Sequence, residues 1–222
     1  MKHVVVDLEM NCLAKEHADK RGICRMEIIE IGAVVLDENF QEIGCFKTLV
    51  KPQLNHVIEK RYVKLTGITT EMVAGAPTFE TALSQFLSWC KSLNDEIGIY
   101  QWSGADLEQI TKEMLLKGIE VDEESMALLQ GWKDFQKEFG DTLHLDRALS
   151  LKNAVMYAGI DFIGRAHDAL YDARTTAELL KIVRTPELCR VALEHVIDAL
   201  TPKEISTSLG DLFDFSALGI GA

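Results

Sequence analysis

Long hydrophobic runs are absent from this sequence. Apolar runs are short, of the length of Val4-Val5-Val6, whereas a membrane-spanning helix needs roughly 20 consecutive apolar residues. The chain opens Met1-Lys2-His3 and reaches an acid already at Asp7, which is not the pattern of a secretory signal peptide. We therefore expect a soluble protein of the cytoplasm.

Proline and glycine are also scarce, with 4 and 15 residues among 222. Collagen-like and low-complexity chains are excluded on that ground. Hydrophobic residues make up 47% and charged residues 26%, so a wholly disordered chain is excluded as well. The length favours one large domain over two small ones.

Positive charge is in short supply. The chain has 23 Lys and Arg residues against 35 Asp and Glu residues, a formal net charge of −12. Overall attraction cannot hold long nucleic acid on such a chain, because phosphates require concentrated positive charge. A short end could still be held by metal ions on carboxylates or by a local basic patch. Such a patch is predicted at 47–64. This segment contains one acid, Glu59, and five basic residues: Lys47, Lys51, Lys60, Arg61 and Lys64.

Paired or metal-binding cysteines are not indicated. The five cysteines form an odd set without Cys-x-x-Cys spacing, at Cys12, Cys24, Cys45, Cys90 and Cys189. Zinc fingers, redox pairs and disulfide frameworks are therefore disfavoured, and a reducing compartment fits. We expect buried or half-buried free thiols.

The hydrophobic pattern predicts strands first and helices later. Runs at 4–8 and 26–36 predict two strands, 41–50 predicts a third that pairs with the second, and 12–25 reads as a polar loop. Helical spacing at 78–90 and 106–116 flanks a buried strand at 96–102. Further helices are expected at 132–139, 149–158, 169–183 and 186–199. This order predicts a mixed-sheet α/β domain.

Two acids on the first strand are the first candidates for chemistry. Side chains alternate along a strand, so Asp7 and Glu9 point to one face while Val6 and Leu8 face the core. Neighbouring carboxylates at a buried strand end repel each other unless a cation lies between them. Either a divalent metal or simple solvation of both acids would satisfy this arrangement.

Two further segments carry candidate residues. Asp106 follows the strand that ends at Trp102, and ligand sites of α/β sheets lie at the carboxyl ends of strands. Its placement also suits a plain helix start. His167 and Asp172 would not share a face of one continuous helix, but they can converge if His167 lies in the loop before it. Taken alone, His167 is better interpreted as a core or surface histidine.

Taken together, these motifs resemble those of a known family. Asp7-Leu8-Glu9, then Asp106, then His167 with Asp172, in that order, match the histidine branch of the DEDD-type 3′→5′ exonucleases (DEDDh). Three further stretches agree: 27–33, 51–69 and 166–173. The resemblance covers about residues 1–185. Within the family, the chain looks most like the group named for the enhanced-RNAi exonuclease and the sporulation inhibitor KapD.

The resemblance implies a fold and a mechanism. The fold would be ribonuclease H-like, with a mixed central sheet, an N-terminal antiparallel hairpin and helices on both faces. Two Mg²⁺ or Mn²⁺ ions would bind to Asp7, Glu9, Asp106 and Asp172, because hard cations prefer oxygen ligands. His167 would be the general base that deprotonates the attacking water. The exonuclease domain would span 1–185, and 186–222 would form a C-terminal helix and an acidic tail.

The resemblance also implies where a substrate binds. Six residues would contact the terminal nucleotide: Leu8, Met10, Leu65, Thr66, Gly67 and Ile68. Leu65 and Ile68 would offer apolar faces, and Gly67 would let the backbone approach the nucleotide. An ordinary turn after a helix is the alternative for 65–68. Many relatives have Thr after the first Glu, where this chain has Met10-Asn11. The hydrogen bond that Thr would give to the substrate is therefore in doubt, and Asn11 could supply another.

The expected activity is release of nucleoside 5′-monophosphates from single-stranded 3′ ends, with RNA or short oligonucleotides preferred. One alternative is a weakly catalytic module that binds nucleic-acid ends or a protein. The acidic tail, with Phe213 and Phe215, mildly favours a protein partner. Another alternative is a metal-stabilised structural domain that has no substrate.

Overall fold

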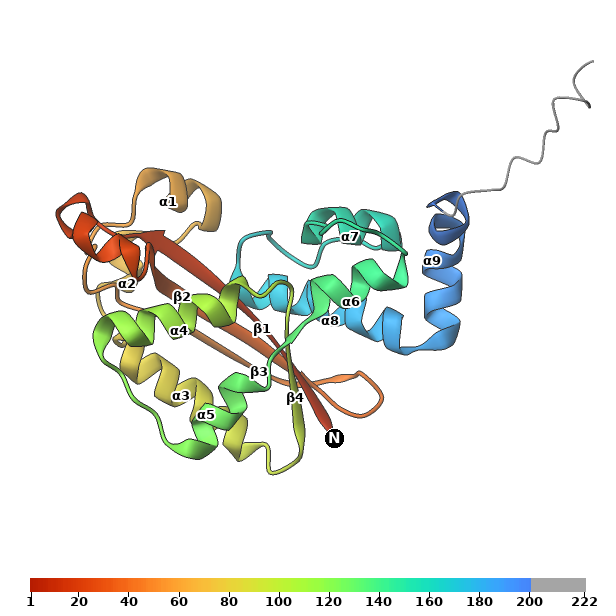
Figure 1. Cartoon of the computed structure of the whole chain (residues 1–222), viewed down its shortest axis with the longest axis horizontal. Helices are drawn as coiled ribbons and strands as arrows, with labels where there is room; N and C mark the ends of the chain where they lie inside the picture. Colours follow the sequence, from red (N-terminus) through yellow and green to blue (C-terminus); the bar gives the residue numbers. More distant parts are fainter. Residues whose placement is uncertain (201–222) are drawn as a thin grey trace, which may run out of the picture.

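The computed structural model describes residues 1–200 (Figure 1). The tail expected at 203–222, with Phe213 and Phe215, lies outside the described residues. No helix within 1–200 combines the length and the apolar character needed to cross a bilayer.

A mixed sheet of five strands runs through the described part of the chain, in the order β3-β2-β1-β4-β5. Strand β2 (Met26–Leu36) pairs antiparallel with both β1 (Lys2–Cys12) and β3 (Glu42–Leu49). On its other side β1 pairs parallel with β4 (Ile97–Gln101), which pairs parallel with the short β5 (Lys133–Asp134). The predicted mixed sheet with an N-terminal antiparallel hairpin is confirmed.

Helices cover both faces of this sheet (Figure 1). On one face, β1 residues Val4, Val6 and Leu8 share a core cluster with residues of α3 (Phe79–Ser92), α4 (Ala105–Lys117) and α5 (Glu123–Gln130). On the other face, Val5 packs in a second cluster with four helices: α6 (Phe135–Thr142), α7 (Leu151–Ala158), α8 (Ala169–Arg184) and α9 (Pro186–Leu200). The alternation along β1 therefore sends even-numbered and odd-numbered side chains into different layers.

Short elements surround the carboxyl end of β1. The segment 12–25, expected as a polar loop, contains a 3₁₀ helix, η1 (Lys15–Gly22), that buries none of its residues. Such a turn has no hydrophobic periodicity, so the pattern could not reveal it. Helices α1 (Lys60–Thr66) and α2 (Thr70–Val73) follow β3 and enclose a small apolar cluster of Ile29, Ile58, Ile68 and Val73.

The last described helix belongs to the same core. Leu193 of α9 is fully buried and Val196 nearly so, in the cluster that also holds residues of α7 and α8. Truncation before α9 would therefore expose apolar surface of α7 and α8.

A buried ionic network anchors the loop between β3 and α1. Glu27 is fully buried and accepts hydrogen bonds from the backbone N–H groups of Gln53 (2.7 Å), Leu54 (2.9 Å) and Asn55 (2.8 Å). Lys117 Nζ lies 3.0 Å from Glu27 Oε1 and 2.7 Å from Glu113 Oε1. Since Glu113 is also fully buried, one ammonium group is the ion-pair partner of two interior carboxylates.

We therefore expect Lys117→Met to lower the free energy of unfolding by about 3–5 kcal/mol, because it leaves buried charges without a partner. Lys112→Met on the same helix is the matched control. Its pair with Glu108 is exposed, so the loss should stay within about 1 kcal/mol. Urea unfolding of both variants measures the difference. Equal losses would show that the buried network contributes no more than a surface pair.

Candidate active site

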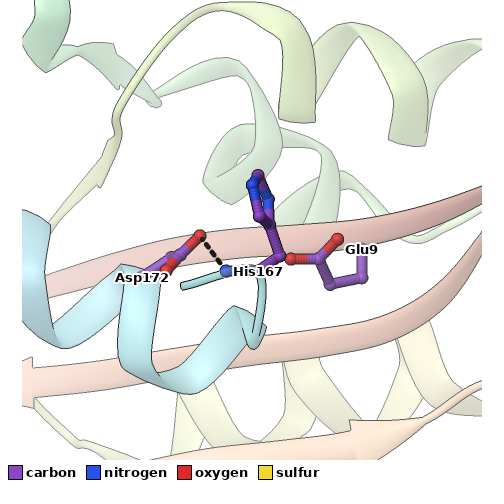
Figure 2. A group of neighbouring side chains, drawn as sticks. All are labelled: Glu9, His167 and Asp172. Atoms are coloured by element: carbon purple, nitrogen blue, oxygen red, sulfur yellow. Dashed lines mark hydrogen bonds between the residues drawn. The ribbon is translucent and has the colours of Figure 1, made fainter. Parts of the chain in front are cut away.

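Three predicted site residues converge at the carboxyl end of β1. One ligand atom from each of Glu9, His167 and Asp172 lies within 4.8 Å of the others. In Figure 2, the His167 side chain stands between the two carboxylates, with Glu9 contributed by β1 and Asp172 by α8. Glu9 and Asp172 are buried, whereas His167 is exposed. The group therefore consists of two buried carboxylates and one imidazole that faces solvent.

The acids of β1 point toward α8, as the alternation of side chains along a strand predicts. Val5 lies in the core layer of α8, so Asp7 and Glu9 follow it on that face. Asp7 pairs with Gly32 of β2, and Glu9 pairs with Glu30. Asp7 is half-buried, and it lies outside the 4.8 Å group.

The close approach of α8 to the sheet depends on Gly32. A Cβ atom on this residue would lie 2.3 Å from backbone atoms of Ala169 and Leu170. Only glycine therefore lets the first turn of α8 lie directly on β2, beside Asp7. Gly32 lies in one of the stretches that match the family, but its role could not be read from the sequence.

Glu30 and Lys47 fix the start of α8. Glu30 Oε2 accepts a hydrogen bond from the Ala169 N–H (3.0 Å), and the Asp168 carboxylate caps the helix by accepting from Tyr171 N–H (3.4 Å). Lys47 Nζ lies 3.3 Å from Glu30 and 2.6 Å from Asp168. Lys47 is thus engaged in this network and does not belong to a free basic patch at 47–64.

His167 is held in an uncommon backbone conformation. Its φ is 62°, a left-handed value that costs free energy in a non-glycine residue and is retained where its surroundings enforce it. Its N–H donates a hydrogen bond of 3.1 Å to Asp172 Oδ2. The other oxygen, Asp172 Oδ1, is buried and has no hydrogen-bond partner within 1–200. A buried carboxylate oxygen without a donor favours a cation as its partner.

Asp106 comes from a different layer. It lies in the first turn of α4, directly after β4, and is 6% exposed. It is outside the 4.8 Å group, but its charge reaches both Asp7 and Glu9. The carboxyl end of β4 thus brings a fourth acid to the same edge of the sheet.

Burial and mutual repulsion make these carboxyls weak acids. Burial, followed by the charge of Asp106, raises the pKa of Asp7 well above its ordinary value. Burial and the charge of Asp172 raise the pKa of Glu9 to about 8. Burial also raises the pKa of Asp106, and it raises that of Asp172 to about 6. Positive charge added among these four groups would favour their ionised forms.

These residues fit a divalent metal. Carboxylate oxygens are the ligands that Mg²⁺ and Mn²⁺ prefer, and the partnerless Asp172 Oδ1 offers one such oxygen. Glu9 and Asp172 supply the closest oxygens, and Asp7 and Asp106 add charge nearby. The site is a candidate divalent-cation centre with an adjacent exposed imidazole.

The six residues expected to contact the substrate differ in their exposure. Leu65 is 44% exposed, and Met10 is half-buried. Gly67 ends α1 with φ of 77° and lies against the Arg165 guanidinium, which donates to Leu65 O (3.1 Å). The side chains of Leu8, Thr66 and Ile68 are buried.

Two of the expected contacts need correction. Ile68 packs in the cluster of Ile29, Ile58 and Val73, so its side chain cannot offer an apolar face to a nucleotide. Asn11 is fully buried, donates to Val57 O (3.1 Å) and accepts from Glu59 N–H (3.2 Å). It therefore anchors the segment before α1 instead of bonding to a substrate. Sequence alone could not show this, because both partners lie more than forty residues away.

Comparison with known proteins gives one family. The model of the exonuclease family RNase_T matches residues 4–180. The ERI1 exoribonuclease 2 of Danio rerio is 29% identical over 82% of this chain, and the 3′-5′ exonuclease crn-4 of Caenorhabditis elegans is 29% identical over 70%. The chain spans only 35% and 55% of the lengths of these two relatives.

Solved structures support the fold. The nuclease domain of 3′hExo, a DEDDh family member bound to rAMP, superposes with a TM-score of 0.70 at 21% identity, covering 81% of this chain and 90% of that one. Cell-death related nuclease 4 gives a TM-score of 0.66 at 24% identity, covering 81% and 62%. The predicted ribonuclease H-like fold and the resemblance to the enhanced-RNAi group are confirmed, and the KapD likeness stays a prediction.

The raised pKa values predict how stability depends on pH without metal. A carboxyl with a higher pKa in the folded state binds more protons when folded, so the free energy of unfolding falls as pH rises between the two values. For Glu9 this window runs from 4.5 to about 8, and for Asp172 from 3.8 to about 6. In EDTA, Tm should therefore fall as pH rises from about 5 to about 8.

Adding Mn²⁺ should remove most of this fall, because a bound cation favours the ionised carboxylates. Glu9→Gln in EDTA should flatten the profile between pH 6 and 8, since Gln has no proton to lose. Thermal melts at matched ionic strength provide the measurement. A wild-type profile that Glu9→Gln leaves unchanged would contradict the assignment of the raised pKa to Glu9.

Proposed function

The chain belongs to the exonuclease family RNase_T, and from that premise we propose that it is a metal-dependent 3′→5′ exonuclease. Its substrates would be single-stranded nucleic-acid ends, and its products nucleoside 5′-monophosphates. The observation that carries the proposal is the meeting of Glu9, Asp172 and an exposed His167 within 4.8 Å. We propose residues 1–185 as the exonuclease domain, followed by a C-terminal helix and acidic tail at 186–222.

The proposed metal ligands are Asp7, Glu9, Asp106 and Asp172. Two Mg²⁺ or Mn²⁺ ions would lower the pKa of a bound water and stabilise the leaving 3′ oxygen. The raised pKa values of the carboxyls suit this role, because the acids gain most from a cation when no other charge neutralises them.

His167 is proposed as the general base. Its ring is exposed beside the acids, so it can take a proton from water at the reacting phosphate and pass it to solvent. The hydrogen bond from its N–H to Asp172 fixes the backbone from which the ring projects.

RNA is the proposed preference. The curated relatives include exoribonucleases, and one solved relative is bound to rAMP, whereas E. coli Exonuclease I was solved with a dT13 oligonucleotide. The exposed Leu65 and the backbone at Gly67 are the proposed contacts of the terminal nucleotide, together with Met10 and the backbone of Leu8 and Thr66. The rival reading, a binding module that cuts little, predicts the same contacts without turnover.

Incubation of the protein with 5′-labelled single-stranded RNA and DNA tests the proposal. With Mg²⁺ or Mn²⁺, ladders shortened from the 3′ end should form, and EDTA should abolish them. Asp7→Ala, Glu9→Ala, Asp106→Ala and Asp172→Ala should each lose nearly all turnover while staying folded. Asp198→Ala, on the exposed side of α9, is the matched control. Near-wild-type cleavage by one of the four at saturating Mn²⁺ would remove that residue from the ligand set.

His167→Ala should still bind metal and substrate, and its kcat should fall by roughly 10²–10⁴-fold, the usual size of general-base catalysis. His195→Ala, another exposed histidine, should retain full kcat. Measuring Tm and kcat on the same preparations separates catalysis from folding. An active but less stable His167→Ala would assign this residue to helix entry instead.

A further inference from the structure

A cavity of about 840 Å³ lies beyond the carboxylates, at the far end of β1. Four basic residues line it: Lys15 and Arg21 of η1, Arg25 just before β2, and Arg61 of α1. The lining also contains one acid, Glu59, and one aromatic ring, Tyr62. We call this cavity the arginine pocket.

The charge of the arginine pocket is opposite to that of the whole chain. Its lining carries four cationic groups and one carboxylate, whereas the chain has a net charge of −12. Neither Lys15 nor Arg25 has an acidic partner within 4 Å in residues 1–200, and Arg21 donates only to the Leu13 carbonyl (2.9 Å). A second cavity, of about 290 Å³, shares Arg21 and Arg25 and extends toward Lys112 of α4. Uncompensated cations in an acidic protein concentrate the field on an anionic ligand.

The arginine pocket lies on the same strand as the first acids of the candidate active site. Cys12, which also lines it, lies three residues beyond Glu9 on β1, a separation of about 10 Å at the rise of a strand. Tyr62 and Arg61 lie on α1, whose end at Leu65 borders the proposed site of the terminal nucleotide. A strand bound by its 3′ end at Glu9 and Asp172 therefore needs only a short length of chain to reach the cavity.

We propose that the arginine pocket binds the sugar–phosphate backbone of a single-stranded substrate a few nucleotides upstream of its 3′ end. The inference rests on the proposed exonuclease function. Guanidinium groups bind phosphate oxygens through paired, charge-assisted hydrogen bonds. Tyr62 adds aromatic surface, and a cationic groove with an aromatic side chain is the usual composition of a sequence-tolerant single-strand site. The Arg61 guanidinium lies 4.6 Å from the Tyr62 ring centre and 3.1 Å from Glu59, so Glu59 restrains Arg61 and leaves the other three cations for phosphate.

The test compares two double variants that remove the same charge. Lys15→Gln/Arg25→Gln alters the pocket, and Lys137→Gln/Arg190→Gln alters exposed residues on α6 and α9. Figure 1 places α9 at the opposite end of the molecule from α1. Binding of a 5′-fluorescein-labelled oligouridylate of twelve nucleotides is followed by anisotropy in EDTA, at several salt concentrations. Hydrolysis of a dinucleotide with Mn²⁺ is measured in parallel, and melting curves verify folding.

For the pocket variant we expect Kd for the 12-mer to rise about tenfold, as when charge-assisted hydrogen bonds are lost. The salt slope should fall by about 1.4, which is two phosphate contacts on a single strand. Dinucleotide hydrolysis should stay at the wild-type rate, because a dinucleotide does not reach the pocket. The control variant should show neither change.

A Kd and a salt slope that match those of the control variant would overturn the proposal. So would unchanged 12-mer binding together with loss of AMP or tripolyphosphate binding, which would assign the pocket to a small phosphate ligand. If wild-type protein cleaves neither substrate, the exonuclease function fails. The binding data in EDTA then still decide whether the pocket holds a strand.

Discussion

Carboxylates that are held together away from water repel each other, and the functional end of this molecule is arranged around that repulsion. Asp7 and Glu9 come from the end of β1, and Asp106 and Asp172 come from the first turns of α4 and α8. Burial together with their neighbours' charges raises the pKa of each. A fold that needed only stability would place apolar residues there. Cations would make the arrangement favourable, so the feature that weakens the metal-free protein supports the proposal that it binds divalent metal.

The position of α8 decides whether this cluster forms. Gly32 lets the helix lie on β2, and Glu30 and Lys47 hold its first turn through Ala169 and Asp168. The helix start in turn fixes His167 and Asp172. Lys47 pairs with both Glu30 and Asp168, and none of its contacts within residues 1–200 reaches Asp7 or Glu9. The protein thus supplies its own cation to the supporting residues, and in the proposed mechanism a metal would serve the central acids.

Periodicity in the sequence was enough to predict the sheet, the larger helices and the face on which Asp7 and Glu9 lie. Strand β2 has the bounds 26–36 that its hydrophobic run indicates, because buried strands of β-branched residues are hard to mistake. The wrong predictions concern residues whose contacts lie far away in the sequence. Asn11 bonds to the loop before α1, and Ile68 packs against β2. Neither partner is close in sequence, so the local pattern suggested a substrate contact for both residues. Likewise Glu27 and Lys117 are ninety residues apart, and no local pattern links them.

Net charge and substrate class conflict at first sight, since a chain of −12 should repel a polyanion. Under the proposed function, the cationic groups of the arginine pocket would hold the strand, and divalent metal would neutralise the acids. The exposure of His167 also helps to distinguish a structural metal site from a catalytic one. A metal that only stabilises a fold is usually closed in by its ligands, whereas a catalytic one keeps a free position. An exposed His167 in a strained conformation beside Asp172 has no use in a closed structural site. A general base facing solvent requires that exposure, and this favours chemistry over mere binding.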